Sequence, residues 1–180
     1  KDGTRKYNEE FRKTEYFKFY NSLINNEKLI TTLKKKGYKI KFIPHANMMS
    51  QIDDFDKNDY VDFSNGVVDY SREFKENSLL ITDYSSVCFD FAYLKKPIIM
   101  AQFDQENFYE GQIYSKGYFD YEQDGFGKVT KTLDETIKEI IKIIENDCKM
   151  EKKYIRKVEK FYKYTDKKNC ERVYEEISKL

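Results

Sequence analysis

Apolar residues recur three and four positions apart over residues 16–33. This spacing places them on one face of a helix, and the polar pair Asn25-Asn26 predicts a break within it. Gly37 follows three lysines and predicts the helix end, because glycine readily adopts the left-handed conformation of a helix cap. Residues 38–43 then show the apolar–polar alternation that predicts a strand, which Pro44 ends because proline has no amide hydrogen for a sheet.

The middle of the chain has the pattern of a strand-helix-strand unit. The apolar run Leu79-Leu80-Ile81 leads into small and capping residues, a helical segment follows, and Pro97 opens a second apolar run over 98–100. Continuous apolar strands joined through a helix are typical of parallel sheets, which are buried on both faces. Further patterns predict a strand at 60–63 and helices at 69–77, 133–144, 150–164 and 169–177.

Strands that alternate with helices predict an α/β domain with an open parallel sheet flanked by helices. In such sheets ligands bind in the crevice outside the carboxyl ends of the strands, so side chains that directly follow strands are the candidates for a site. The segment 101–127 is too long for a simple connection and is rich in Phe, Tyr, Gly and acidic residues, which favours a functional loop.

The net charge of the chain is too small to attract a charged partner by itself. The chain has 180 residues with 33 Lys+Arg and 32 Asp+Glu, a formal net charge of +1, so we expect no nucleic-acid partner. Aromatic residues, 17% of the chain, supply enough apolar surface for a core. Two prolines and seven glycines provide no linker, so residues 1–180 are predicted to form one domain.

The cysteines and the N-terminus indicate the cellular compartment in which we expect the protein. Cys88, Cys148 and Cys170 are far apart and odd in number, which favours a reducing, cytosolic compartment over a disulfide framework. No run approaches the roughly 18 apolar residues of a membrane span, and no apolar signal segment follows the N-terminus. The chain does not begin with Met, from which we expect it to be a fragment of a longer protein.

The turn from Thr82 to Ser86 is the first candidate site. It joins a buried strand to a helix, where free amide groups and the helix dipole favour an anion and the hydroxyls of Ser85 and Ser86 add donors. Thr82, Ser85 and Ser86 are therefore the candidate phosphate-binding residues, with an ordinary helix cap as the alternative. Asp83 has the same charge sign as phosphate, so we expect it to cap the helix or to accept backbone N–H groups.

Two further residues are candidates near the same sheet edge. His45 is the only histidine and follows a strand, where an imidazole can hold a phosphate oxygen or move a proton. A structural histidine is the alternative. Asp90 lies about one and a half turns into the predicted helix, where a carboxylate could accept both hydroxyls of a ribose. An exposed helical aspartate is the alternative there.

Other chemistries lack their motifs. The acidic residues between 53 and 59 resemble the start of a calcium loop, but its glycine and bidentate glutamate are missing, so a solvated acidic loop is the better interpretation. One histidine and scattered cysteines make no zinc site, no nucleophile elbow or P-loop occurs, and we expect no metal. Residues 149–168 hold nine basic and three acidic side chains with interleaved aromatic residues, which suits a polyanion or a solvated helix face.

These motifs resemble the CDP-glycerol:poly(glycerophosphate) glycerophosphotransferases, which make teichoic acids and capsules in bacteria. The resemblance runs from Gly3-Thr4-Arg5 to residues 166–173. Its strongest part consists of residues 80–86, Phe89-Asp90 and residues 95–98. Pro44-His45, Phe103-Asp104 and residues 117–120 support it. It implies the Rossmann-like C-terminal half of a GT-B fold, which binds the donor nucleotide, with the N-terminal acceptor half absent from this sequence.

The resemblance also implies roles and a reaction. Ser85 and Ser86 would bind the donor pyrophosphate, and His45 would contact phosphate in catalysis. Asp90 would bind the ribose. Glycerol phosphate or another polyol phosphate would pass from a CDP-polyol to a polyol-phosphate or glycan acceptor, with release of CMP. This is an EC 2.7.8.- transfer that is expected to need no metal or cofactor.

The resemblance further implies where the full-length enzyme works. We expect it in the cytoplasm, peripheral at the inner face of the bacterial cell membrane, where an anionic membrane surface could be a further partner. The fragment alone is expected to bind nucleotide weakly and not to turn over, because the family also uses a histidine in the absent half as its base.

Other function classes stay open. The Ser85-Ser86 turn alone does not exclude a glycosyltransferase of the same GT-B architecture that uses a nucleotide sugar. A non-catalytic nucleotide-binding module is the second alternative, although Pro44-His45 stands where a phosphoacceptor receiver needs an acidic pair. An interaction domain that binds polyanions through residues 149–168 is the third.

Overall fold

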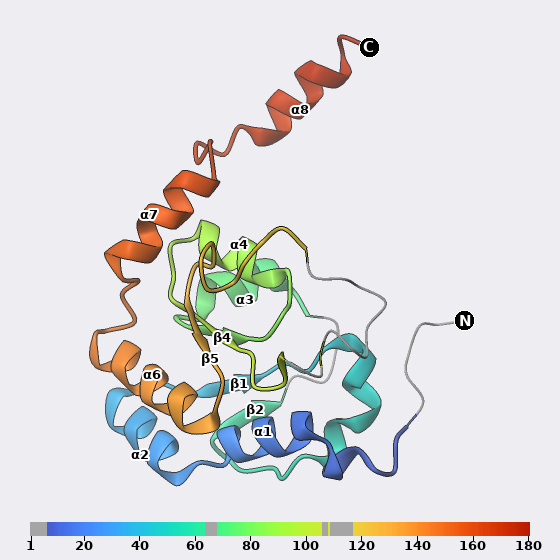
Figure 1. Cartoon of the computed structure of the whole chain (residues 1–180), viewed down its shortest axis with the longest axis vertical. Helices are drawn as coiled ribbons and strands as arrows, with labels where there is room; N and C mark the ends of the chain where they lie inside the picture. The colour runs from blue at the N-terminus through green and yellow to red at the C-terminus, as the bar shows by residue number, and fades with distance from the viewer. Residues whose placement is uncertain (1–6, 64–67, 106–107, 109–116) are drawn as a thin grey trace.

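The computed structural model describes residues 7–63, 68–105, 108 and 117–180 (Figure 1). Its helices are α1 (Glu15–Ile24), α2 (Glu27–Lys36), α3 (Tyr70–Glu76), α4 (Val87–Tyr93), α6 (Leu133–Glu145), α7 (Lys152–Phe161) and α8 (Asn169–Ile177). Its strands are β1 (Ile40–Phe42), β2 (Val61–Phe63), β3 (Leu80–Thr82), β4 (Ile98–Ala101) and β5 (Lys128–Thr130). Two 3-10 segments cover Phe11–Lys13 and Ala46–Asp54.

The predicted break between the first two helices is confirmed. Asn25 follows the last residue of α1, and the Asn26 Oδ1 accepts a hydrogen bond of 3.0 Å from the Leu29 amide, which caps the start of α2. Gly37 ends α2 with a φ of 74°, the left-handed conformation that glycine adopts without strain. These caps determine where α1 and α2 end, and therefore where the chain turns into β1.

The strands form two parallel sheets instead of the single open sheet that we expected. β1 pairs with β2, and β4 lies between β3 and β5. All residues of β1 and β3 are described, and no backbone hydrogen bond joins these two strands. The strands predicted at 38–43, 60–63, 79–81 and 98–100 are present. The pattern does not predict β5, because Lys128-Val129-Thr130 contains one large apolar residue.

Helices cover both faces of the three-stranded sheet. Ile99 and Ala101 of β4 pack in one apolar cluster with α1, α2 and α6. Ile98 and Met100 point to the other face and pack in a second cluster with α4 and α7. All four residues are buried, so β4 is the central strand that its continuous apolar run predicts.

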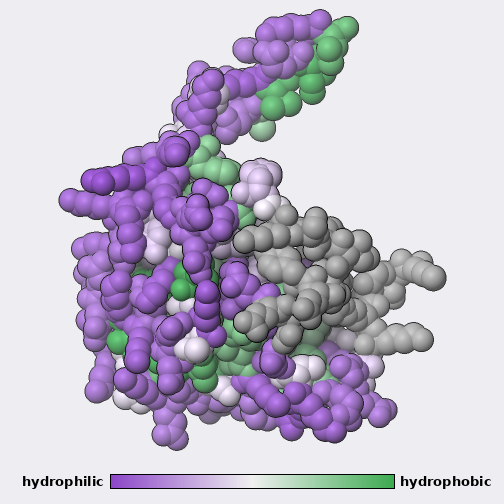
Figure 2. All heavy atoms as spheres, in the orientation of Figure 1, coloured by the Kyte–Doolittle hydropathy of each residue, from purple (hydrophilic) through white to green (hydrophobic). Residues whose placement is uncertain are grey.

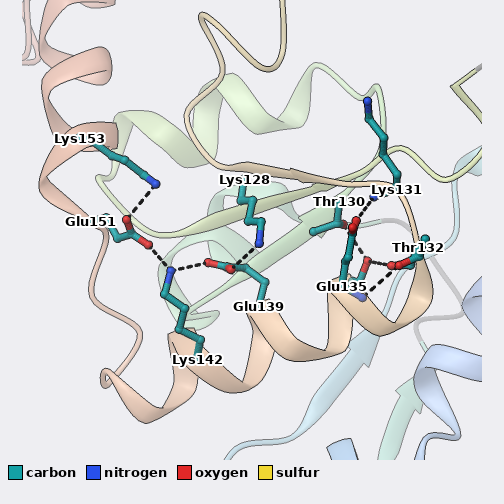
Figure 3. A network of polar contacts seen from close by, with 10 residues as sticks. Lys128, Thr130, Lys131, Thr132, Glu135, Glu139, Lys142, Glu151 and Lys153 are labelled. Atoms are coloured by element: carbon teal, nitrogen blue, oxygen red, sulfur yellow. Dashed lines mark hydrogen bonds and ion pairs between the residues drawn. The ribbon is translucent and has the colours of Figure 1, made fainter.

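An ionic network ties β5 to α6 and to the start of α7 (Figure 3). Glu139 on α6 is 4% exposed, and its carboxylate oxygens lie 3.2 Å from Lys128 Nζ and 3.1 Å from Lys142 Nζ. Lys142 Nζ also lies 2.7 Å from Glu151 Oε1, just before α7. A buried carboxylate needs such compensation. The network therefore holds β5, which has little apolar surface of its own, against the helix layer.

The two C-terminal helices differ in how they are held. α7 packs on the body and buries Val158, whereas α8 extends away from it and buries no residue (Figure 1). Figure 2 shows hydrophobic side chains along one side of α8. Val173, Tyr174 and Ile177 of this helix are exposed. No described helix is long and apolar enough to cross a membrane.

Candidate functional site

A cavity of about 1240 Å³ lies between β1 and β3. Its lining includes Pro44 and His45, which follow β1, and the turn that runs from Thr82, the last residue of β3, to Ser86. Each segment directly follows a strand, where the ligands of α/β sheets bind. The structure therefore brings His45 and the three predicted phosphate-binding residues, Thr82, Ser85 and Ser86, to one cavity.

The two serines have hydroxyls that the helix does not use. Ser86 immediately precedes α4, and its side chain makes no capping hydrogen bond. Within the described part of the chain, neither the Ser85 nor the Ser86 hydroxyl forms a hydrogen bond. Asp83 Oδ1 accepts a hydrogen bond of 2.6 Å from the Tyr84 amide, one of the two arrangements expected for this carboxylate. The ordinary cap therefore does not account for Ser86.

His45 reaches the cavity from the other sheet. It is exposed, it follows the buried Pro44, and its carbonyl oxygen accepts a hydrogen bond of 2.7 Å from the Met48 amide. This bond turns the chain into the 3-10 segment that begins at Ala46. His45 therefore lies just after β1, exposed and among the residues that line the cavity.

Tyr84 and Asp104, which the sequence analysis did not propose as site residues, also line the cavity. Tyr84 donates a hydrogen bond of 3.1 Å to Asp104 Oδ1, and Tyr121 donates one of 3.1 Å to the Tyr84 carbonyl. Burial raises the pKa of Asp104; the Tyr84 hydrogen bond opposes this, and the charges of Asp83 and Glu15 add to it. Asp104 follows β4, so the rule of side chains at strand ends could have found it.

Two tyrosines of α1 complete this part of the lining. Tyr16 and Tyr20 both line the cavity, and Tyr20 is buried. Burial raises the pKa of both phenols well above its ordinary value, and the charges of Asp83 and Asp104 raise it further. Both hydroxyls therefore stay protonated at neutral pH, so they add hydrogen-bonding capacity without charge.

The structure does not bring Asp90 to this cavity. Asp90 is exposed on α4 and does not belong to the lining. Burial raises the pKa of Tyr162 to about 12, and the charge of Asp90 contributes to this shift. The Tyr162 hydroxyl donates a hydrogen bond of 2.7 Å to the Phe89 carbonyl, which places this part of α4 against the end of α7. The ribose role of Asp90 stays a prediction without support from the geometry.

The acidic residues between 53 and 59 hold neighbouring segments in place. Arg12 Nη2 lies 2.7 Å from Asp56 Oδ1, and Asn21 donates a hydrogen bond of 2.9 Å to Asp56 Oδ2. Within the described ranges no group of three or more potential metal ligands comes together. Gly3-Thr4-Arg5, with which the family resemblance begins, lies outside the described residues.

Half of the basic stretch 149–168 is α7, and its aromatic residues are only partly covered: Phe161 and Tyr164 are exposed, whereas Tyr154 and Tyr162 are half-buried. The ring centroid of Phe161 lies 5.2 Å from that of Phe126, and the ring of Tyr162 lies 6.1 Å from the same partner. Lys153 pairs with Glu151 at 3.1 Å. These contacts favour a solvated helix face, and a polyanionic partner for this stretch stays a prediction.

Comparison with known proteins agrees with the motifs. A family model described as CDP-glycerol:poly(glycerophosphate) glycerophosphotransferase matches residues 5–179. The chain is 42% identical over 178 residues, 99% of its length, to the minor teichoic acid biosynthesis protein GgaB of Bacillus subtilis. It is 45% identical over 74 residues, 41% of its length, to the teichoic acid poly(glycerol phosphate) polymerase of the same species.

A solved structure shares the fold. The wall teichoic acid polymerase TagF resembles the chain with a TM-score of 0.61 and 23% sequence identity, over 87% of this chain and 38% of that chain. This likeness and the parallel strands flanked by helices confirm the expected α/β fold class. The chain spans 19% of the length of GgaB and 10% of the B. subtilis polymerase, so it corresponds to a part of these relatives.

Proposed function

This chain belongs to the CDP-glycerol:poly(glycerophosphate) glycerophosphotransferase family, and we propose that it is the donor-binding domain of a polyol-phosphate transferase of teichoic acid or capsule synthesis. The donor would be CDP-glycerol or a related CDP-polyol, and the acceptor a polyol-phosphate or glycan polymer. The observation that carries the proposal is the cavity in which His45, Ser85 and Ser86 meet from two different sheets.

The chemistry of the transfer explains the use of these residues. An acceptor hydroxyl attacks the β-phosphorus of the donor and forms the new P–O bond. The bond from the β-phosphorus to the bridging oxygen breaks, and CMP leaves with that electron pair. Ser85 and Ser86 donate hydrogen bonds to the phosphate oxygens, and an N–H of His45 donates to the oxygens that gain charge. The domain therefore contributes positioning and electrostatic stabilisation.

The proposal covers donor binding and not the whole enzyme. Because the chain spans 19% of GgaB and 38% of the TagF chain, we assign acceptor binding to other parts of such longer proteins. The base that takes the proton from the acceptor hydroxyl is assigned there as well. We therefore expect the 180-residue chain to bind a CDP-polyol weakly and to catalyse no polymerisation by itself.

Ligand-observed saturation-transfer NMR tests the proposal, because it detects weak binding. The chain is titrated with CDP-glycerol, CDP, CMP and UDP, and then with a UDP-sugar. We expect selectivity for cytidine ligands and at least about a tenfold loss of CDP-glycerol affinity in Ser85→Ala/Ser86→Ala, since hydrogen bonds to charged groups are strong. His45→Ala should weaken CDP-glycerol and CDP more than CMP, which lacks the β-phosphate.

Ser71→Ala is the matched control, because Ser71 is exposed on α3 and lies outside the cavity lining. It should leave every affinity unchanged. A preference for the UDP-sugar would replace the proposal by a nucleotide-sugar glycosyltransferase. Cytidine binding that survives all three cavity substitutions would place the donor elsewhere on the chain.

We also propose that the full-length enzyme works in the cytoplasm, peripherally at the inner face of the bacterial membrane. The basic side chains of α7 and the exposed apolar residues of α8 support this, since anionic lipid surfaces attract such segments. Sedimentation with phosphatidylglycerol vesicles and not with phosphatidylcholine vesicles is expected. Equal sedimentation with both, or none with either, would contradict a membrane role of this chain.

A further inference from the structure

Asp104 is a carboxylate that the fold places in the donor cavity. It lies three residues after the end of β4, and β4 pairs with β3, whose end leads into the Thr82–Ser86 turn. Parallel strands end at the same edge of a sheet, so Asp104 and the turn share this edge. Both line the cavity that His45 reaches from β1.

The Asp104 carboxylate is held in position by an anchored tyrosine. Tyr84 donates a hydrogen bond of 3.1 Å to Asp104 Oδ1. The Tyr84 ring stacks on Phe108 with 3.6 Å between ring centroids, and its carbonyl accepts a hydrogen bond of 3.1 Å from Tyr121. A carboxylate has about four acceptor positions, and the Tyr84 hydroxyl fills one of them. The others suit further donors.

The charges around Asp104 define the kind of donor that fits. Asp104 forms no ion pair with any described residue, and burial together with the charges of Asp83 and Glu15 raises its pKa. A phosphate here would be repelled. An uncharged hydroxyl donates a hydrogen bond to a carboxylate without this penalty, and two hydroxyls on neighbouring carbons can donate to its two oxygens. The matching ligand group is a vicinal diol.

A CDP-polyol donor carries this group twice, in its ribose and in its polyol end. The carboxylate that the family resemblance implies for the ribose, Asp90, does not belong to the cavity lining. Asp104 belongs to the same lining as the predicted phosphate-binding residues Ser85 and Ser86. Asp104 therefore lies in the same cavity that would bind the phosphates of the donor.

We propose that Asp104 is a specificity-determining residue that binds a vicinal diol of the donor, with Tyr84 holding its carboxylate. This inference rests on the proposed function, because it assumes that the cavity takes a CDP-polyol. Ribose and polyol present the same chemistry to a carboxylate. The experiment below distinguishes them with ligands that carry one of these diols, both or neither.

The experiment compares four ligands on the 180-residue chain by saturation-transfer NMR. CDP-glycerol carries both diols, the propyl ester of CDP lacks the polyol diol, CDP has the ribose diol alone, and 2′,3′-dideoxy-CDP has neither. Asp104→Asn keeps the shape of the side chain and removes its charge. We expect it to weaken CDP-glycerol about tenfold, as for a charge-assisted hydrogen bond. Asp134→Asn is the matched control, because Asp134 is exposed on α6 and lies outside the cavity lining, and it should have no effect.

The ligands separate the two sources of the diol. A loss for CDP and its propyl ester that is absent with 2′,3′-dideoxy-CDP assigns Asp104 to the ribose. A loss confined to CDP-glycerol assigns it to the polyol. Tyr84→Phe, which keeps the ring and removes the donor to Asp104, should reproduce a smaller loss of about threefold for the same ligand. Asp104→Glu should recover part of the affinity.

Two results would overturn the inference alone. One is unchanged affinity of Asp104→Asn and Tyr84→Phe for all four ligands while the wild-type chain binds them selectively. The other is an equal loss for 2′,3′-dideoxy-CDP, which has no diol. If the wild-type chain binds no cytidine ligand, the proposed function fails and this inference fails with it. Circular dichroism of each variant shows that the fold is retained.

Discussion

The two sheets of this domain are held in different ways, and the cavity lies between them. β4 is buried along its whole length, with helices on both of its faces. The two-stranded sheet has no such central strand: β1 and β2 pair with each other, and each buries one of its three residues, as the outer strands β3 and β5 do. Ser85, Ser86 and Asp104 follow strands of the three-stranded sheet, and His45 follows a strand of the two-stranded sheet. The candidate site is thus assembled across a junction that a bound donor would bridge.

The largest effect is expected in the three-stranded sheet, at Gly127. A Cβ at this position would lie 2.0 Å from the Ile98 carbonyl oxygen, so β4 and β5 would have to separate. We expect Gly127→Ala to lower the free energy of unfolding by about 3 kcal/mol or more in urea denaturation. Gly117→Ala is the control, because a Cβ there meets no atom of a described residue within 4 Å. Equal stability of the two variants would contradict the close packing of this sheet.

The two-stranded sheet should respond to a smaller change at α3. Lys41 Nζ of β1 lies 2.5 Å from Glu73 Oε1, and Asn77 donates a hydrogen bond of 3.0 Å to Glu73 Oε2. Glu73→Gln leaves the Lys41 ammonium without its counter-ion and should cost about 1–2 kcal/mol, since Lys41 stays partly solvated.

Hydrogen exchange locates this effect. Amides of β1 should exchange faster in Glu73→Gln while those of β4 keep their rates. Glu76→Gln, which removes an exposed i,i+4 pair with Arg72, is the control and should cost less than about 0.5 kcal/mol. Faster exchange in both sheets alike would show that they unfold as one unit and would remove the contrast between them.

An effect of opposite sign is expected at the end of β4. Gln102 is 1% exposed, and neither its Nε2 nor its Oε1 has a hydrogen-bond partner among the residues that the structure describes. A buried amide without partners costs free energy, so Gln102→Met, which keeps the length and removes the polar atoms, should stabilise the domain by about 1 kcal/mol. Thermal unfolding measures this. A loss of stability would mean that the amide is satisfied in solution.

The smallest effect is expected for Asp104 and depends on pH. Its folded-state pKa is raised, so the stability that its protonated form contributes is present below the ordinary pKa and is lost as pH rises through the folded pKa. Asp104→Asn removes the partly buried charge. We expect a melting temperature about 1 °C higher at pH 7, because solvent screens most of the effect, and no difference near about pH 3. A pH-independent difference would contradict this.

This last prediction connects stability with function. The same Asp104→Asn substitution is expected to stabilise the domain and to weaken the binding of CDP-glycerol. Opposite signs would show that the carboxylate serves a ligand and not the fold. Two losses together would mean that Asp104 has a structural role.

Local signals in the sequence predicted much of this fold. Asn25-Asn26 and Gly37 identified the helix ends because capping depends on neighbouring residues. The strand at 79–81 and the helix after it followed from an apolar run and a turn, and they place the Thr82–Ser86 segment correctly. The strand at 98–100 extends to Ala101 in the structure.

Features that depend on distant contacts were not predictable in this way. β5 exists through its pairing with β4 and the Glu139 network, and neither leaves a pattern in its own three residues. The absence of pairing between β1 and β3 depends on how the two sheets are placed in space, which the sequence of neither strand indicates. The sequence predicted the position of Asp90 within a helix. Which side of α4 carries it depends on how α4 packs against α7. The position of Asp104 after a strand was visible in the sequence, but its hydrogen bond with Tyr84 and its place in the cavity lining depend on the packed structure.

The central claim is that a CDP-polyol binds across the junction of the two sheets. Amide chemical-shift mapping of the isotope-labelled chain during titration with CDP-glycerol tests it most directly. We predict shifts in both the segment around His45 and the Thr82–Ser86 turn, with the same ligand dependence, and a further shift at Asp104. Shifts confined to one sheet, or to α7 and α8, would contradict the claim.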